Sequence, residues 1–354
     1  MKRIISIIMV MVLALTAFAA CKKETVPSEV SSEVSSSVAS ETEKSKEPSA
    51  APESSVKEKP QVKLGVLKGP TGIGASYLLE QNANGKSLNS YEVQVVAEAT
   101  DIVSQVASGN LDIAAVPTNV ASSLYNKTEG GVKILALNTS GVLYILEKGD
   151  SIKEIKDLKG KTIYATGQGA NPEYVLNYIL TQNGLEPGKD VTIEFMDSAA
   201  LVTEAASGNV DIAMLPVPAV TTVLVKNQEF RSALSLSKEW DKLNNGSVLT
   251  MGCIIARKEF IENNPEAIDN FLKEYEVSIN YVKANPKESG EFCEKFEIVP
   301  AAAIATKAIP DCNLIFVKGE EIKEYLAGYY QILFEADPKS IGGKIPADDI
   351  YEIR

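Results

Sequence analysis

Short apolar runs alternate with longer amphipathic or polar stretches along most of the chain. The apolar runs of strand length cover residues 62–67, 91–97, 111–116, 132–137, 142–147, 162–166, 191–195, 210–215 and 251–256. Helices are expected between them, and beyond residue 258 the pattern is mostly helical. Strands that alternate with helices favour an α/β fold with mainly parallel sheets.

One of these helix–strand units occurs twice. Residues 107–117 read ASGNLDIAAVP, and residues 206–216 read ASGNVDIAMLP. In each copy Gly109 or Gly208 lies where a helix C-terminus favours a positive φ, and the final proline ends the strand. Two similar units predict two similar lobes, and a cleft between two lobes is a common ligand site.

The chain is expected to pass between the two lobes twice. Lobe 1 then comprises residues 61–147 and 250–354, and lobe 2 comprises residues 148–249. Two crossings form a hinge, which suits opening and closing around a ligand.

The composition narrows the classes of function. The chain has 354 residues, enough for two domains, and a formal net charge of −12, which disfavours nucleic acid as a partner. It contains no histidine. That absence removes the Ser-His and Cys-His nucleophile pairs and the commonest metal ligand. We therefore expect no enzyme activity, no catalytic residue, no metal site and no cofactor.

The N-terminal region reads as a secretion signal followed by a spacer. A basic start at residues 1–3 precedes an apolar stretch at residues 4–18, so residues 1–20 are expected to be a signal peptide. Small residues then precede Cys21, as in a bacterial lipobox, although an ordinary secretory cleavage at the A-x-A pattern is the alternative. Residues 21–60 are expected to be the lipidated cysteine and a disordered tether rich in Ser, Glu and Pro. The protein should then lie outside the cytoplasm, anchored to the bacterial cell membrane by lipidated, palmitate-bearing Cys21.

The remaining cysteines and the single tryptophan favour structural roles. Cys253, Cys293 and Cys312 form no C-x-x-C pair and are expected to be buried small hydrophobic residues. A disulfide between Cys293 and Cys312 stays open, because pairing cannot be deduced from sequence alone. Trp240 is expected in the core or at a lobe edge rather than as a stacking platform.

Candidate ligand contacts follow from the rule that ligands of open α/β sheets lie beyond the carboxyl ends of the strands. Residues 69–73 form a Gly-rich turn after the first strand, and residues 167–171 form its counterpart in lobe 2. Each turn opens a helix, whose N-terminus favours an anion. A tight turn without a ligand, or a helix N-cap in the case of Thr118, is the structural alternative. The candidate ligand-binding residues are Gly69, Pro70, Thr71, Gly72, Ile73, Thr118, Asn119, Asn138, Thr139, Gly167, Gln168, Gly169, Asn171 and Pro216.

These residues do not select one ligand. They include no arginine, which disfavours a bidentate clamp on a dicarboxylate. A sulfonate or small oxyanion held by helix ends would fit, and so would a small neutral heterocycle held by hydroxyls and amides. Asn138 and Thr139 either line the floor of the cleft or satisfy backbone groups at the hinge, and Pro216 supplies shape. Asp112 and Asp211 lie at the opposite ends of their strands and are expected to cap turns.

Several segments together resemble one known family. DLKGKTI at residues 157–163 is followed by GLEP at 184–187, and RKEF at 257–260 leads to NPEA at 264–267. With the lipobox, the tether, the early Gly-rich turn and the paired G-x-x-D-I-A strands, they resemble the solute-binding proteins of bacterial ABC importers in the nitrate/sulfonate/taurine branch. The resemblance covers about residues 62–340. It implies a two-lobed type II periplasmic-binding-protein fold that captures a small molecule and delivers it to a permease, without catalysis.

The partners implied are a small-molecule ligand, an ABC permease and a separate ATPase, because no G-x-x-x-x-G-K-[ST] loop occurs in this chain. A monomer is expected. One alternative is an enzyme on the same fold, like the relative that makes the pyrimidine half of thiamine and uses an active-site histidine as a substrate. The absence of histidine argues against it. The other alternative is a ligand sensor or adhesin lipoprotein.

Overall fold

The computed structural model describes residues 58–354. The signal peptide predicted at residues 1–20, the lipidation site Cys21 and nearly all of the tether predicted at residues 21–60 lie outside the described residues. Within residues 58–354, none of the helices combines the length and the apolar composition that a membrane span requires.

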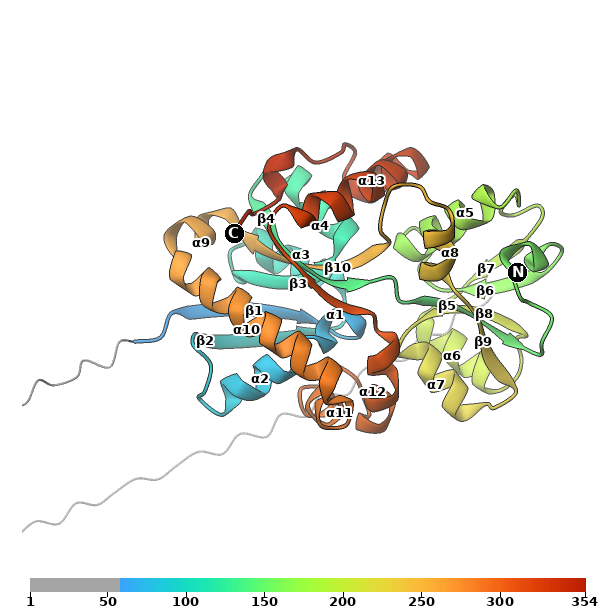
Figure 1. Ribbon diagram of the computed structural model, residues 1–354, viewed down its shortest axis with the longest axis horizontal. Helices are drawn as coiled ribbons and strands as arrows, with labels where there is room; N and C mark the ends of the chain where they lie inside the picture. Colours follow the sequence, from blue (N-terminus) through green and yellow to red (C-terminus); the bar gives the residue numbers. More distant parts are fainter. Residues whose placement is uncertain (1–57) are drawn as a thin grey trace, which may run out of the picture. The chain divides into compact units, whose positions relative to one another are not determined.

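The strands of the described chain form two sheets (Figure 1). The first sheet has the strand order β11-β4-β10-β3-β1-β2, and the second has the order β7-β6-β8-β5-β9. The strands of the first sheet are β1 (Gln61–Leu67), β2 (Ser90–Val96), β3 (Ile113–Pro117), β4 (Val132–Ser140), β10 (Thr250–Arg257) and β11 (Leu314–Val317). Those of the second are β5 (Leu143–Lys148), β6 (Thr162–Ala165), β7 (Thr192–Phe195), β8 (Ile212–Pro216) and β9 (Phe230–Ser235).

Helices pack on both faces of the sheets. Around the first sheet, α3, α4 and α13 lie on one face, and α2 and α10 lie on the other (Figure 1). The helices are α1 (Pro70–Ile73), α2 (Ser76–Ala83), α3 (Ala99–Ala107), α4 (Thr118–Lys127), α5 (Asn171–Gln182), α6 (Ser198–Ala206), α7 (Ala219–Lys226), α8 (Leu236–Lys242), α9 (Lys258–Asn263), α10 (Pro265–Ala284), α11 (Pro286–Lys295), α12 (Ala302–Ala308) and α13 (Glu321–Ala336). Short 3₁₀ turns are η1 (Ile155–Leu158), η2 (Ile309–Asp311), η3 (Pro338–Ile341) and η4 (Asp348–Ile350). The α/β class and the two-sheet architecture predicted from the sequence are confirmed.

Both sheets are mixed, which corrects the expectation of mainly parallel sheets. β1 pairs in parallel with β2 and β3, and β6 pairs in parallel with β7 and β8. In contrast, β10 and β5 run antiparallel to both of their neighbours, and β11 runs antiparallel to β4. Strands β5 and β10 begin where the chain passes from one sheet to the other. They follow no β–helix–β unit within their own sheet, and only such a unit enforces a parallel pairing.

The two copies of the repeat have the same local structure. α3 leads into β3 and α6 leads into β8, and each of these strands has parallel and antiparallel neighbours inside its sheet. Gly109 and Gly208 have φ values of 77° and 76°, as a helix C-terminus requires. Pro117 and Pro216 are the last residues of their strands. The predicted helix end, glycine stop and short strand are confirmed in both copies.

Helix α13 of the first sheet packs against the second sheet's helices at the junction of the two halves. Trp240 of α8 is 1% exposed and lies between Tyr178 of α5 and Tyr329 of α13, at ring-centroid distances of 4.9 and 5.6 Å. The indole N–H donates to the Ser247 hydroxyl at 3.1 Å. Trp240 is therefore a core residue, as the sequence predicts.

Candidate functional site

The Gly-rich turn after β1 is closed by its own backbone and by packing. Gly69 has a φ of 88° and a ψ of −153°, a backbone conformation that essentially only glycine adopts. The N–H groups of Gly72 and Ile73 both donate to the Gly69 carbonyl, at 3.1 and 3.2 Å. A Cβ on Gly72 would lie 2.1 Å from the Leu67 carbonyl oxygen. The close approach made possible by Gly72 is therefore to β1, inside the protein.

The crossing residues Asn138 and Thr139 hold this turn in place. Asn138 is 1% exposed, and its amide nitrogen donates to the Thr71 carbonyl at 2.9 Å and to the Tyr275 hydroxyl at 3.0 Å. Its amide oxygen accepts from the Thr139 hydroxyl at 3.1 Å. All polar atoms of the Asn138 amide are thus satisfied within the protein. This is what the second predicted role of Asn138 requires, namely that it satisfies backbone groups at the hinge.

Thr118 and Asn119, which follow β3, also make contacts within the protein. The Thr118 hydroxyl donates to the Thr250 carbonyl at 2.7 Å, and Pro117, rather than Thr118, is the N-cap of α4. Asn119 is half-buried, and its amide nitrogen lies 3.4 Å from the Ser340 carbonyl. Asn119 and Ser340 line one hollow of about 310 Å³ between α3, α4 and η3.

The counterpart turn after β6 is less enclosed. Gly167 and Gly169 have φ values of 83° and 70°, and no atom of the described chain lies within 4 Å of the place a Cβ would take on Gly169. Gln168 is exposed. Asn171, the first residue of α5, is only 3% exposed, yet neither its amide nitrogen nor its amide oxygen has a hydrogen-bond partner within residues 58–354. Orphaned buried amides are rare in folded proteins.

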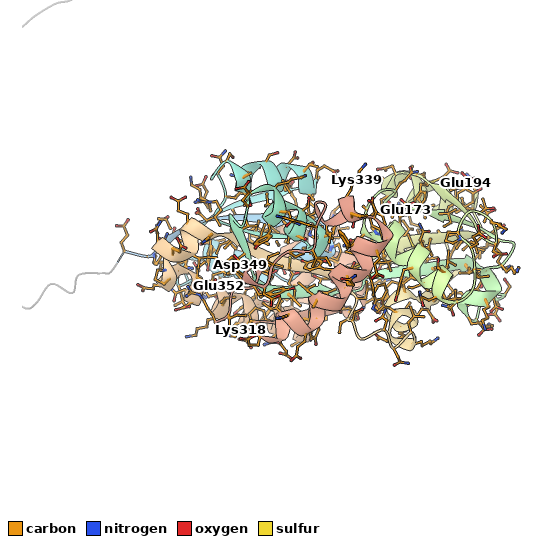
Figure 2. The ribbon with its side chains drawn as sticks, turned by 90° about the horizontal axis from the view of Figure 1, so that it is seen from above. Glu173, Glu194, Lys318, Lys339, Asp349 and Glu352 are labelled. Carbon is orange, nitrogen blue, oxygen red and sulfur yellow. The ribbon has the colours of Figure 1, made fainter. Side chains whose placement is uncertain are left out.

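Charged and phenolic groups surround this second turn. The Gly169 N–H donates to the Glu173 carboxylate at 2.6 Å. The Tyr174 hydroxyl donates to the Asp337 carboxylate at 3.0 Å and lies 3.2 Å from the Gly169 carbonyl. Burial and the neighbouring Asp337 carboxylate raise the pKa of Tyr174 to about 12, so this hydroxyl remains a donor at neutral pH. Figure 2 labels Glu173 and also Lys339, which follows Asp337 into η3.

The structure therefore brings the predicted residues together in two groups. Thr71, Asn138 and Thr139 form a buried cluster around Tyr275. Asn119 and the turn at residues 167–171 form the other group, because both adjoin the segment at residues 337–340. Pro216 pairs with Leu143 at the end of β8.

Sequence analysis missed the residues that hold each of these groups together. Tyr174 and Asp337 connect α5 to the end of α13, and Tyr275 of α10 completes the Asn138 cluster. The rule used on the sequence selects loops that follow strands, whereas these three residues come from helices or a helix end.

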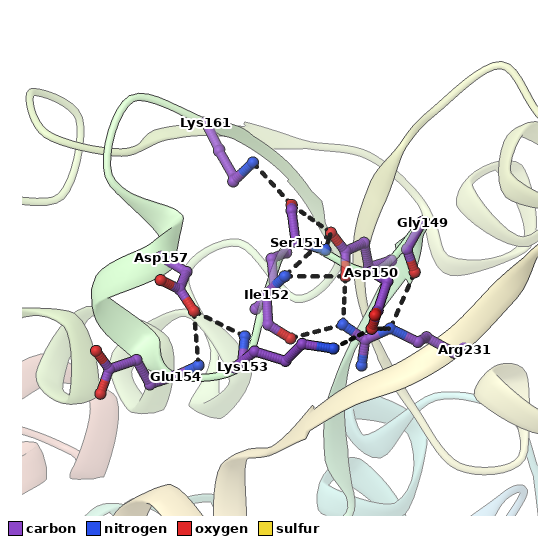
Figure 3. Close-up of polar contacts among 10 residues, drawn as sticks. Gly149, Asp150, Ser151, Ile152, Lys153, Glu154, Asp157, Lys161 and Arg231 are labelled. Carbon is purple, nitrogen blue, oxygen red and sulfur yellow. Dashed lines mark hydrogen bonds and ion pairs between the residues drawn. The ribbon is translucent and has the colours of Figure 1, made fainter.

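The opposite ends of the strands carry buried ion pairs. Glu147 is 3% exposed and accepts from the Ser151 N–H at 2.8 Å, the Ile152 N–H at 3.1 Å and the Arg231 guanidinium at 2.6 Å. Burial alone would raise the pKa of Glu147, but these hydrogen bonds and the Arg231 charge outweigh it and lower that pKa. Figure 3 shows the surrounding network from Lys161 through Ser151 to Arg231.

The three described cysteines are free and buried. The disulfide that the sequence left open between Cys293 and Cys312 is thus not formed in this structure. Burial raises the pKa of the Cys293 thiol to about 11, and it raises those of Cys253 and Cys312 further. Residues 58–354 contain no cluster of three or more His, Cys, Asp or Glu side chains arranged to hold a metal.

Known proteins share this architecture. The crystal structure of an ABC transporter from Parabacteroides distasonis matches with a TM-score of 0.70 and 22% identity, covering 83% of this chain and 99% of that chain. The periplasmic aliphatic sulphonate binding protein SsuA from Escherichia coli matches with a TM-score of 0.64 and 17% identity, covering 82% and 94%. At these identities the likeness shows the two-lobed periplasmic-binding-protein fold.

Sequence comparison gives a relative and a family. A Brucella abortus protein that is described as a binding protein is 26% identical over 206 residues, or 58% of this chain. The match spans 61% of that relative's length. The family model described as NMT1/THI5 like matches residues 88–289, more than half of the 354 residues. The chain therefore belongs to the NMT1/THI5-like family.

Proposed function

We propose that this protein is the extracytoplasmic solute-binding component of an ABC importer. The observation that carries the proposal is the pair of Gly-rich turns at equivalent strand ends of two sheets, which the chain joins by two passages. Such an arrangement suits hinge closure on a small molecule. Similar proteins support it, because they are an ABC transporter, a sulphonate binding protein and a protein described as a binding protein.

The importer role divides the chain into two moving parts. Residues 61–147 and 250–354 form lobe 1, and residues 148–249 form lobe 2. The ligand lies between them, in contact with the turns at residues 69–73 and 167–171 and with Thr118, Asn119, Asn138, Thr139 and Pro216. Of these, Asn119, Gly169 and Asn171 are the best supported, because they adjoin the segment where the two halves meet.

The protein acts as a monomer that presents its closed form to a permease, with ATP hydrolysis on a separate chain. Lipidated Cys21 and the tether hold it at the outer face of the cell membrane. A lipid chain on that cysteine supplies the anchor. Replacing Cys21 with alanine should therefore release the protein from washed membranes, whereas Cys293→Ala should leave it bound.

The same proposal assigns no catalysis to this chain. An enzyme that consumes its own histidine is disfavoured, because the sequence has none. The sensor or adhesin role remains the second candidate, and it predicts that the ligand-bound protein binds a partner without stimulating transport.

A reconstituted importer tests the proposal. The full-length lipoprotein, its permease and its ATPase would be placed in liposomes, and ATP hydrolysis would be followed with and without small molecules released from protein purified from its own host. Stimulation that requires a co-purified small molecule, returned chemically unchanged, is the expected result. A chemically altered product would favour an enzyme, and ligand binding without stimulation would favour a sensor.

A further inference from the structure

Asn-Gly pairs, at which an asparagine can lose its side-chain amide spontaneously, occur three times in this chain. A glycine has no side chain to shield its backbone nitrogen, so that nitrogen can approach the side-chain carbonyl carbon of the preceding asparagine. All three glycines are exposed and have similar φ values, of 69°, 77° and 74°. Backbone conformation therefore does not distinguish the pairs, whereas their hydrogen bonds do. The pairs are Asn84 with Gly85, Asn183 with Gly184, and Asn245 with Gly246.

In the first two pairs the glycine nitrogen is already engaged at a helix end. The Gly85 N–H donates to the Asn82 carbonyl at 3.0 Å, and the Gly184 N–H donates to the Thr181 carbonyl at 3.0 Å. The asparagine amide nitrogens likewise donate to carbonyls of their own helices, α2 and α5. Each of these glycine nitrogens has to break a hydrogen bond before it can act as a nucleophile.

The third pair is arranged differently. The Gly246 N–H donates to no acceptor within residues 58–354. The Asn245 amide oxygen accepts two hydrogen bonds from Ser247, from its N–H at 3.0 Å and from its hydroxyl at 2.8 Å. The Ser247 hydroxyl is itself oriented, because it accepts from the Trp240 indole N–H at 3.1 Å. The nucleophile is thus free, while the carbonyl group that it would attack is polarised.

Two donors on that oxygen favour attack on the carbonyl carbon. When the Gly246 nitrogen bonds to Asn245 Cγ, the amide oxygen Oδ1 gains negative charge, which donors at about 2.7–3.1 Å stabilise. The Cγ–Nδ2 bond then breaks, and Nδ2 leaves as ammonia with the proton that the Gly246 nitrogen gives up. Water opens either carbonyl of the resulting succinimide ring and leaves aspartate or isoaspartate at position 245. One water is consumed and one ammonia is released.

We infer that Asn245 is a site of spontaneous deamidation in the folded protein, and that the hydrogen bonds from Ser247 promote the reaction. The inference is independent of the proposed function, because it needs no ligand and no partner chain. The Asn-Gly sequence alone places the three pairs on an equal footing, and the hydrogen bonds select one of them.

The site lies where the chain returns from the second sheet to the first, between α8 and β10 (Figure 1). The Asn245 amide nitrogen lies 3.3 Å from the Tyr178 hydroxyl of α5. Helix α13 also packs closely here, since a Cβ on Gly328 would lie 2.9 Å from the Ser247 Cβ and 3.2 Å from the Gly246 carbonyl oxygen. Deamidation removes the donor to Tyr178, and isoaspartate also adds a carbon to the backbone beside α13. The modified protein should therefore be less stable.

Incubation of the folded protein in a mildly alkaline buffer tests the inference. Peptide mass spectrometry measures conversion at all three pairs in one sample, so Asn84 and Asn183 are internal controls. We expect Asn245 to deamidate at least about tenfold faster than either, because one preorganised oxyanion donor can change a rate by about 10²–10³. In denaturant these hydrogen bonds are lost, and the three rates should converge.

Variants assign the effect to particular groups. Ser247→Ala removes the hydroxyl donor and keeps the N–H, so it should slow conversion at Asn245 at least about fivefold and leave the other two pairs unchanged. Asn245→Gln should block the reaction, since its longer side chain would have to close a larger ring. Incubation should then lower the Tm of the wild-type protein but not that of Asn245→Gln.

The comparison within one folded sample decides the inference even if a variant fails to fold. Conversion at Asn245 that is no faster than at Asn84 and Asn183 would overturn it. A faster rate that persists in denaturant would overturn it too, because the cause would be local sequence and not structure. An unchanged rate at Asn245 in folded Ser247→Ala would overturn the part given to the Ser247 hydroxyl.

Discussion

The turns after β1 and β6 occupy equivalent places in the two sheets but differ in what their polar groups do. In the first turn the N–H groups of Gly72 and Ile73 close on the Gly69 carbonyl, and Asn138 satisfies the Thr71 carbonyl. In the second turn the space beside Gly169 is open, and the Asn171 amide has no partner in the described chain. The Gly69 and Thr71 carbonyls of the first turn are therefore already paired within the protein, whereas the second turn retains unused hydrogen-bonding capacity.

The same contrast appears at the opposite ends of the repeated strands. Asp112 of the first copy is 8% exposed, accepts from the Lys63 N–H at 2.9 Å and pairs with Arg257 at 2.6 Å. Asp211 of the second copy is exposed. In the second sheet the buried carboxylate is instead Glu147, which pairs with Arg231. The two copies of the repeat are nearly identical in sequence and equivalent in position. Only the first copy, however, contributes a buried and ion-paired aspartate.

The largest expected effect comes from adding bulk to the two turns. Gly72→Val should lower the free energy of unfolding by about 3 kcal/mol or more, because its Cβ would collide with the Leu67 carbonyl. Gly169→Ala should cost only about 1 kcal/mol, since it meets open space and strains a positive φ. Urea unfolding of both variants measures the difference. Equal costs would mean that the two turns are packed alike.

Removing the repeated aspartates comes next. Asp112→Ala should cost about 2–4 kcal/mol, because the partly buried Arg257 guanidinium and the Lys63 N–H lose their acceptor. Asp211→Ala should change the free energy of unfolding by less than about 0.5 kcal/mol, as is usual for an exposed site. Chemical denaturation decides the point, and a larger loss at Asp211 would reverse the assignment of roles.

A smaller loss is expected from the cluster that supports the first turn. Asn138→Ala should cost about 1–3 kcal/mol, because it leaves the Thr71 carbonyl and the Tyr275 hydroxyl without their donor. Asn119→Ala is the matched control, with a single long contact of 3.4 Å, and should cost about 0.5 kcal/mol. If Asn138→Ala unfolds like wild type but loses a ligand-induced Tm shift, the Asn138 amide serves the ligand and not the stability of the first turn.

The smallest effect is a dependence of stability on pH in the second sheet. The pKa of Glu147 is lower in the folded protein than its usual value of 4.5, so its stabilisation is present above that value and is lost as the pH falls through the folded pKa. Glu147→Gln should therefore cost about 1 kcal/mol at pH 7, and the difference from wild type should shrink below about pH 4.5. Glu194→Gln, at an exposed position, should match wild type throughout. A pH-independent difference at Glu147 would attribute its effect to packing.

Much of the fold follows from the spacing of apolar residues. The region beyond residue 258 is mostly helical, as its pattern predicts, and its longest helix is α10, from Pro265 to Ala284. The repeated strands begin and end near their predicted bounds. The missed elements are β9, α8 and β11. β11 has four residues, follows Asn313 with a φ of 45°, and is defined by pairing with β4 rather than by its own pattern.

The strand-end rule predicts where candidate site residues lie, but it does not predict which of their polar groups are already satisfied. The strand-end rule selected Asn119 and Asn171, which the structure places beside the same segment at residues 337–340. Whether an amide is satisfied depends on residues far away in sequence. Asn138 is satisfied by Tyr275, whereas Asn171 meets no partner in the described chain. That distinction arises from tertiary packing, which periodicity and turn residues do not encode.

The position of Trp240 gives this protein an optical reporter of its own. The chain has one tryptophan, and its indole lies between an aromatic ring on α5 and another on α13, helices that belong to different sheets. All tryptophan fluorescence therefore comes from the seam between the two halves. A rotation of one half against the other would alter the ring stacking and the solvent contact of that indole, so its emission would follow the motion without an attached dye.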